Sequence, residues 1–89
     1  MLARNWRGAS GEIDLIVSDG ALLVIVEVKA RADDRFGSPA LAVDAGKQRR
    51  LRRLAVEWLA EHPELRGCEI RFDVVAVTGA RVEVFAAAF

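Results

Sequence analysis

A tight turn between two apolar segments is the feature that most limits how this chain can fold. An Asp-Gly pair at positions 19–20 separates segments 12–18 and 21–29, which are rich in valine, isoleucine and leucine. Asp-Gly in this setting is typical of a two-residue type I′ turn that joins antiparallel strands. The sequence therefore predicts a β-hairpin in which Ser18 faces Ala21.

That pairing brings charged side chains together. Counted from the turn, Glu12 lies opposite Glu27, and Asp14 lies opposite Ile25. Directly opposed residues share a face of a sheet, as do residues two apart on one strand, and opposed Cβ atoms lie about 5 Å apart. Three carboxylates and an ammonium group on one face pack poorly in a core but suit a divalent cation. These groups belong to Glu12, Asp14, Glu27 and Lys29.

The alternative is an ordinary charged sheet face exposed to water. Two observations favour the cation site. Apolar side chains occupy the same predicted face at Ile16, Leu23 and Ile25, and facing like charges destabilise a sheet unless something neutralises them. A one-residue slip would send one acidic pair to the other face, so the interpretation depends on the turn.

Composition indicates a small protein without a strong charge bias. Its 89 residues suffice for one domain, 1–89, and the 53% apolar content supports a packed core. Basic and acidic side chains number 13 each, which gives zero formal net charge. The first 53 residues hold ten basic and seven acidic side chains, and the remainder hold three and six. The basic excess lies near the acidic motifs and suits a polyanion, but the chain is not a strongly basic nucleic-acid binder.

Cysteine and histidine are too scarce for a disulfide or a zinc site. Cys68 is the only cysteine and His62 the only histidine. Since Pro63 follows His62, we interpret His62 as a helix-end residue. No apolar run is longer than six residues, the length of segment 21–26, which is too short to cross a bilayer. We expect a cytoplasmic protein that does not contact the membrane.

Periodicity predicts the element order β-β-β-α-β-β. Asp44 suits the cap of the main helix and Pro63 its end, while Ser38 and Pro39 predict a short helical turn at 39–43. The helix carries an apolar stripe at helical spacing, made of Leu51, Leu54, Ala55, Trp58 and Leu59. The expected strands are 2–7, 12–18, 21–29, 68–77 and 81–85, and the main helix is 44–61.

Four arginines within five positions follow the start of that helix. They either solvate an ordinary helix face or contact phosphates, and the lack of any acid among them favours phosphates. Lys47 and Gln48 lie on the side of the apolar stripe, one turn earlier. The candidate nucleic-acid-binding residues are Arg31, Lys47, Arg49, Arg50, Arg52 and Arg53.

A single acid, Asp73, interrupts the apolar strand predicted at 68–77. A buried carboxylate needs a partner. We expect Asp73 either to hold Arg4 or Arg7, a structural role that we favour, or to support the acidic site. The apolar tail at 86–89 receives no assignment from the pattern.

Taken together, these motifs resemble a known family. An acid on one strand and Glu-x-Lys on the next resemble the PD-(D/E)xK nuclease superfamily, which includes type II restriction enzymes and archaeal Holliday-junction resolvases. The wider string is similar to the bacterial YraN family over almost the whole chain. The segments that carry the similarity are Arg4-Asn5-Trp6-Arg7, Gly11-Glu12-Ile13-Asp14-Leu15-Ile16, Val26-Glu27-Val28-Lys29, Arg35-Phe36-Gly37-Ser38-Pro39, Lys47-Gln48-Arg49-Arg50 and Arg71-Phe72-Asp73-Val74-Val75.

The resemblance implies an α/β fold with a restriction-endonuclease-like mixed sheet, in which the usual N-terminal helix is missing before the first strand. Asp14 matches the superfamily's metal-binding aspartate, Glu27 its second metal ligand and Lys29 its catalytic lysine. Gln48 resembles the helix glutamine of members with a Gln-x-x-x-Tyr element, although position 52 here is arginine.

The expected chemistry is Mg²⁺-dependent or Mn²⁺-dependent hydrolysis of phosphodiester bonds. Asp14 and Glu27 would supply carboxylates to the ion, the Val28 carbonyl is a candidate third ligand, and Glu12 is a candidate outer or second-metal ligand. The catalytic candidates are thus Asp14, Glu27, Lys29 and Gln48. The expected substrate is nucleic acid, either DNA, branched DNA included, or RNA, with DNA preferred.

Two other functions stay open at this point. One is a module of the same fold that binds nucleic acid or protein without cutting, and the other is a purely structural interaction module. The predicted hairpin is apolar on both faces, with Ile13 and Ile16 on opposite sides, yet only one long helix is available to cover it. We therefore expect a homodimer that covers the second face.

Overall fold

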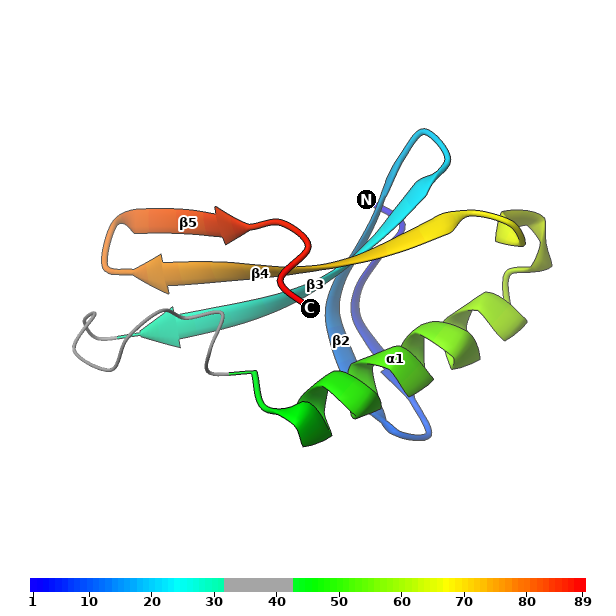
Figure 1. Ribbon diagram of the computed structural model, residues 1–89, viewed down its shortest axis with the longest axis horizontal. Helices are drawn as coiled ribbons and strands as arrows, with labels where there is room; N and C mark the ends of the chain where they lie inside the picture. The colour runs from blue at the N-terminus through cyan, green and yellow to red at the C-terminus, as the bar shows by residue number, and fades with distance from the viewer. Residues whose placement is uncertain (32–42) are drawn as a thin grey trace.

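The computed structural model describes residues 1–31 and 43–89, which form a mixed sheet with one long helix against it (Figure 1). Among these residues, five strands lie in the order β1-β2-β3-β4-β5, and the β3–β4 pair alone is parallel. The predicted α/β class and element order are confirmed. The elements are β1 (Ala3–Gly8), β2 (Gly11–Asp19), β3 (Leu22–Arg31), α1 (Ala45–Ala60), the short 3₁₀ helix η2 (Pro63–Leu65), β4 (Glu69–Thr78) and β5 (Arg81–Phe85).

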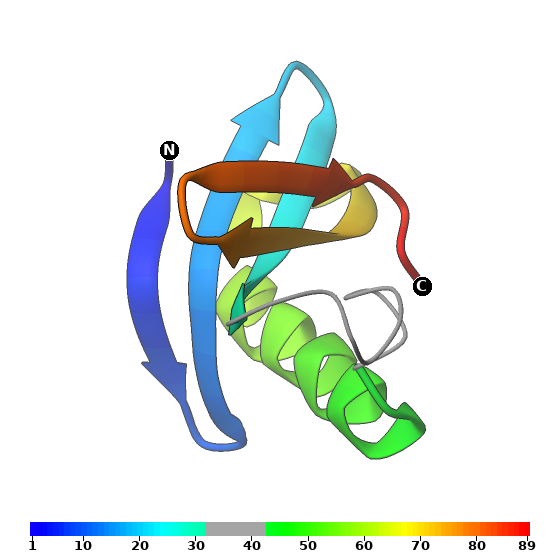
Figure 2. The same cartoon turned by 90° about the vertical axis from the view of Figure 1, so that its left-hand side faces the viewer.

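Helix α1 crosses one face of the sheet and closes the core (Figures 1 and 2). It begins at the predicted cap, where the Asp44 carboxylate accepts a hydrogen bond from the Lys47 backbone N–H at 2.8 Å. Of the turn expected at 39–43, residues 39–42 and the Ser38 cap lie outside the described residues. Burial of the apolar stripe on the sheet stabilises the helix. The core includes Ile13, Ile16, Leu23, Ile25, Leu51, Leu54, Ala55, Trp58, Phe72 and Val74.

The β2–β3 hairpin turns at Gly20 and Ala21, one position later than predicted. Asp19 pairs with Leu22, so Ser18 faces Leu23 and not Ala21. A type I′ turn needs positive φ at both central residues, whereas here Gly20 has φ of 60° and Ala21 is not in that region. The pairing is therefore shifted by two residues, which preserves the face of each side chain in the paired segments 15–19 and 22–26 but changes its neighbour.

The pairing of β1 with β2 is interrupted at Asn5 and Asp14. Their ladder pairs Arg4 with Leu15 and then Trp6 with Ile13, without the intervening rung. Asn5 has φ of 51°, the left-handed region that non-glycine residues rarely adopt.

The break changes which side chains enter the core. Ile13 and Ile16 are both 0% exposed although they are three positions apart. A regular strand would put them on opposite faces, so the expectation that they lie on opposite sides is wrong. In Figure 1, β3 and β4 extend together while β1 and β2 turn down along α1.

Asp73 and the C-terminal tail close one edge of the core. The buried Asp73 carboxylate accepts hydrogen bonds from Arg71 Nε at 2.8 Å and Arg71 Nη2 at 2.9 Å, so the expected partners on β1 are wrong. Arg71 is only two residues from Asp73 on the same strand, so its side chain lies closer to the carboxylate than an arginine on β1 does. Burial alone would raise the pKa of Asp73, but the bonds from Arg71 and from the Ala87 N–H lower it. The carboxylate is thus structural, as favoured.

The tail itself packs beside the helix. The Ala88 N–H donates to the Phe72 carbonyl at 2.8 Å, and the Phe89 ring stacks on Phe72 with centroids 5.1 Å apart. The Arg52 guanidinium lies over both rings, 5.0 and 5.4 Å from their centroids. The tail therefore covers the core edge on the α1 side of the sheet.

The sheet face opposite α1 carries exposed valines. Val28, Val82 and Val84 share this face by register and are 37%, 60% and 64% exposed. The expected homodimer would bury such a surface and stays a prediction. Among the helices that the structure describes, none is long and apolar enough to span a bilayer.

Glu57 on α1 holds the β1–β2 turn. Its carboxylate accepts hydrogen bonds from the Ala9 N–H at 2.6 Å and from the Ser10 hydroxyl at 2.5 Å. Gly8 makes this approach possible, because a Cβ there would lie 2.6 Å from Glu57 Oε1. The Ser10 bond, opposed by burial and supported by Ala9, lowers the pKa of Glu57.

Glu57→Gln should lower the free energy of unfolding at neutral pH and flatten its dependence on acid pH. Because the folded pKa lies below the ordinary 4.5, the carboxylate stabilises the fold above 4.5, and this contribution disappears as pH falls through the folded pKa. Urea unfolding from pH 7 to 3 measures both effects. Glu61→Gln, at the exposed end of the same helix, is the control. Parallel curves for wild type and Glu57→Gln would show that the carboxylate adds no stability.

Candidate functional site

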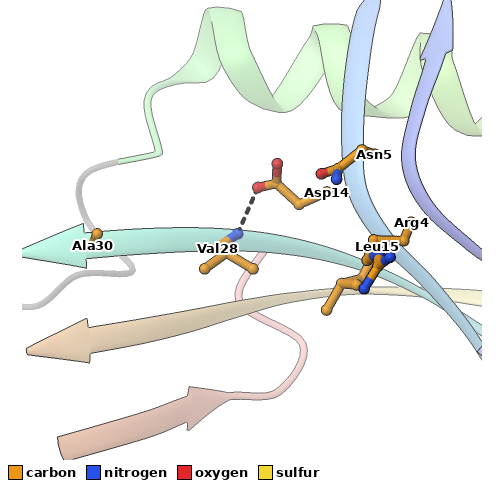
Figure 3. A pocket seen from close by; sticks show the side chains of 6 residues that line it. All are labelled: Arg4, Asn5, Asp14, Leu15, Val28 and Ala30. Carbon is orange, nitrogen blue, oxygen red and sulfur yellow. Dashed lines mark hydrogen bonds between the residues drawn. The ribbon is translucent and has the colours of Figure 1, made fainter. Parts of the chain in front are cut away.

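Asp14 lies just beyond the point where the backbone pairing of β2 with β3 ends. The paired rungs between these strands end at Leu15 and Val26. Beyond that point the Asp14 carboxylate takes over from the backbone, and its Oδ2 accepts a hydrogen bond from the Val28 N–H at 2.8 Å (Figure 3). An ionised carboxylate has about four acceptor positions, so Asp14 retains capacity for a ligand. The broken ladder thus presents an acidic side chain between two strands.

Glu27 is a buried carboxylate that two lysines neutralise. It lies on central strand β3, and its side chain is 7% exposed. Lys47 of α1 forms a direct ion pair with Glu27 Oε1, and Lys29 Nζ lies 4.0 Å from the same oxygen. Since a buried charge without a partner is strongly unfavourable, these lysines explain how Glu27 remains beneath the helix.

The two lysines also change each other's pKa. Partial burial and then neighbouring Lys47 lower the pKa of Lys29, and the attraction of Glu27 and Asp14 opposes this change only in part. Burial would also lower the pKa of Lys47, but its contact with Glu27 prevails and the pKa rises. Lys29 therefore lies within electrostatic reach of both Asp14 and Glu27. The structure brings these three predicted site residues together.

Glu12 does not join them. It lies directly opposite Arg7 on β1 and pairs with that guanidinium at 3.4 Å. In residues 1–31 and 43–89 no three acidic, histidine or cysteine side chains are arranged to hold a metal. The predicted pairing of Glu12 with Glu27, and of Asp14 with Ile25, is wrong because the hairpin register is shifted by two residues; Ile25 pairs with Ile16.

Gln48 is engaged locally. Its side-chain Nε2 donates to the Val43 carbonyl at 3.0 Å, just before the helix. Arg49, Arg50, Arg52 and Arg53 are exposed on α1, although Arg52 lies over the two rings of the tail. The Arg31 side chain lies outside the described part of the chain. Lys47, a candidate nucleic-acid-binding residue, forms an ion pair with Glu27, and its contact with nucleic acid stays a prediction.

A surface hollow of about 390 Å³ lies beside Asp14 (Figure 3). Arg4 and Asn5 of β1 contribute polar side chains to it, and sequence reasoning did not identify either as a site residue. For Asn5 the sequence did contain an indication, because asparagine is uncommon inside strands. The hollow is lined by Arg4, Asn5, Asp14, Leu15, Val28 and Ala30.

Comparison with known proteins finds similarity over most of the chain. Residues 1–77 match the model of a family described as "Uncharacterised protein family UPF0102". A UPF0102 protein of Frankia alni is 55% identical over 78 residues, which cover 88% of this chain and 64% of that protein. A UPF0102 protein of Beutenbergia cavernae is 52% identical over 81 residues, covering 91% and 68%. One from Geobacter metallireducens is 45% identical over 78 residues, covering 88% and 63%. The matched part of this chain is thus just under two thirds of the Frankia alni protein's length.

Proposed function

Because the chain belongs to the UPF0102 (YraN) family and gathers Asp14, Glu27 and Lys29 where two strands separate, we propose that residues 1–89 form a metal-dependent nuclease domain. The proposed fold is restriction-endonuclease-like. The proposed reaction is hydrolysis of a phosphodiester bond, with DNA as the preferred substrate, branched DNA included. The observation that carries the proposal is the Asp14 carboxylate at the end of the β2–β3 ladder, with Lys29 in electrostatic reach of it and of Glu27.

The donor set suits Mg²⁺ or Mn²⁺. Mg²⁺ binds through one or two carboxylates and keeps several water ligands, and Asp14 and Glu27 offer two carboxylates. The Val28 carbonyl is the proposed third oxygen. Such an ion supplies Lewis-acid stabilisation of the phosphate oxygens when bound.

The remaining residues take roles that follow from position. Lys29 would orient the attacking water and offset negative charge that develops on the phosphate. Lys47 neutralises Glu27 and would compete with the cation for the same oxygen. Exposed Arg49 and Arg53 on α1 would contact the nucleic-acid backbone without reading its sequence.

Asp14→Asn should abolish Mn²⁺ binding and cleavage without unfolding the protein. The asparagine oxygen can still accept the Val28 N–H, so the strand junction survives while the charge is lost. Calorimetric titration with Mn²⁺ and cleavage of labelled linear DNA, branched DNA and RNA measure the two effects. Glu12→Gln is the matched control, because Glu12 is on the same strand but pairs with Arg7.

Each outcome of that experiment is decisive. Wild-type Mn²⁺ affinity in Asp14→Asn would overturn the metal site. If the wild-type protein binds metal and DNA but cleaves no substrate, the chain has the alternative function, a nucleic-acid-binding module that does not cut. The ion pair of Lys47 with Glu27 favours that alternative, since it occupies one of two carboxylates.

A further inference from the structure

The irregular residue Asn5 has a chemical consequence beyond strand geometry. It is one of two non-glycine residues with positive φ in the described chain, at 51°, and the missing rung of the β1–β2 ladder falls between Asn5 and Asp14. Asparagine is among the residues that adopt this conformation most readily. An unusual backbone beside a candidate active site is a reason to look for a function.

The hollow beside Asp14 collects the polar groups of this irregular segment. Arg4 and Asn5 line it together with Asp14, while Leu15, Val28 and Ala30 provide apolar surface (Figure 3). Within residues 1–31 and 43–89, neither the Arg4 guanidinium nor the Asn5 amide has a hydrogen-bond or ion-pair partner. The other arginine of β1 differs, because Arg7 pairs with Glu12. The hollow therefore presents several unused N–H donors next to a carboxylate.

We propose that Arg4 and Asn5 form a subsite for a backbone phosphate of the nucleic acid. A guanidinium binds phosphate through paired hydrogen bonds, and the asparagine NH₂ adds a further donor. The inference rests on the proposed function, since the Asp14 carboxylate would repel a phosphate unless a divalent cation lies between them. Phosphate binding at this subsite is therefore coupled to metal binding at Asp14, and the apolar surface contacts the adjoining sugar or base.

The test measures binding of a short fluorescein-labelled DNA duplex by anisotropy, in Ca²⁺ and in EDTA. In wild type, Ca²⁺ should raise the affinity about tenfold, within the usual range of coupling between sites. Arg4→Gln should lose most of that gain and lower the logarithmic salt slope by about 0.9, the value of one duplex phosphate contact. Arg7→Gln is the matched control from the same strand and should keep the gain.

Asn5→Gly separates the amide from the backbone. Glycine adopts positive φ without strain, so this variant keeps the irregular conformation and removes only the donor. It should lose several-fold in Ca²⁺-dependent affinity while its thermal stability stays close to that of wild type. Binding equal to wild type would show that Asn5 serves the backbone alone.

A Mn²⁺ titration of the same variants distinguishes the two proposals. Wild-type Mn²⁺ affinity in Arg4→Gln, together with lost DNA affinity, is the expected result. Wild-type Mn²⁺ and DNA affinities in Arg4→Gln would overturn the subsite and leave the proposed function standing. If wild type binds no Mn²⁺, the proposed function falls, and the coupled phosphate site falls with it.

Discussion

Lys29→Ala should lower the rate of DNA cleavage by about 10²–10³-fold, the usual cost of removing one group that stabilises charge in the transition state, while Mn²⁺ affinity persists. Lys29 extends from β3 toward Glu27, 4.0 Å from its carboxylate, and feels the charge of Asp14. It is not a metal ligand, because an ammonium group has no lone pair to offer. Its removal therefore deletes the group proposed to act on water and phosphate and leaves both carboxylates in place. Single-turnover cleavage and Mn²⁺ calorimetry on the same samples measure the two effects.

Lys47→Met is the comparison variant for Lys29→Ala, because Lys47 is the other lysine beside Glu27. Methionine keeps much of the apolar stem and removes the ammonium group. Since one competing cation is lost, Mn²⁺ affinity should rise and cleavage should persist. If cleavage instead survives in Lys29→Ala and disappears in Lys47→Met, the catalytic lysine is the one on the helix.

Trp58→Ala should destabilise the fold by about 3–5 kcal/mol, the usual cost of deleting a buried tryptophan. Trp58 is 2% exposed and lies toward the C-terminal end of the α1 stripe. Its ring stacks on His62 at 3.8 Å, and His62 Nδ1 lies 2.8 Å from the Trp58 carbonyl, which confirms the predicted helix-end role of His62. Because small domains are stable by only about 5–15 kcal/mol, this loss is a large part of the total.

Urea unfolding followed by circular dichroism provides the measurement. Val56→Ala, on the same helix and 67% exposed, is the control and should change the free energy of unfolding by less than about 0.5 kcal/mol. A Trp58→Ala protein that unfolds at the same urea concentration as Val56→Ala would show that the core does not depend on this ring.

Local patterns in the sequence were sufficient for the elements and their order. The stripe from Leu51 to Trp58 has helical spacing, and its residues are buried in α1 as expected. The Asp44 cap and the turn at Gly79 also depend only on nearby residues. Side-chain alternation likewise placed Glu27 on the same face as Ile25 and Leu23, which the structure confirms. Each of these features is determined within a few positions along the chain.

Features that depend on contacts between distant segments were decided only by the tertiary structure. Pairing shifted by two residues keeps each paired side chain on its face, so the sequence could not distinguish the predicted register from the observed one. Glu12 was wrongly placed beside Glu27 and pairs with Arg7. The break at Asn5 and Asp14 requires two strands to lose the same rung. Lys47 of α1 meets Glu27 of β3 although the two residues are twenty positions apart in the sequence. Such contacts follow from packing in three dimensions, which the periodicity of one segment does not encode.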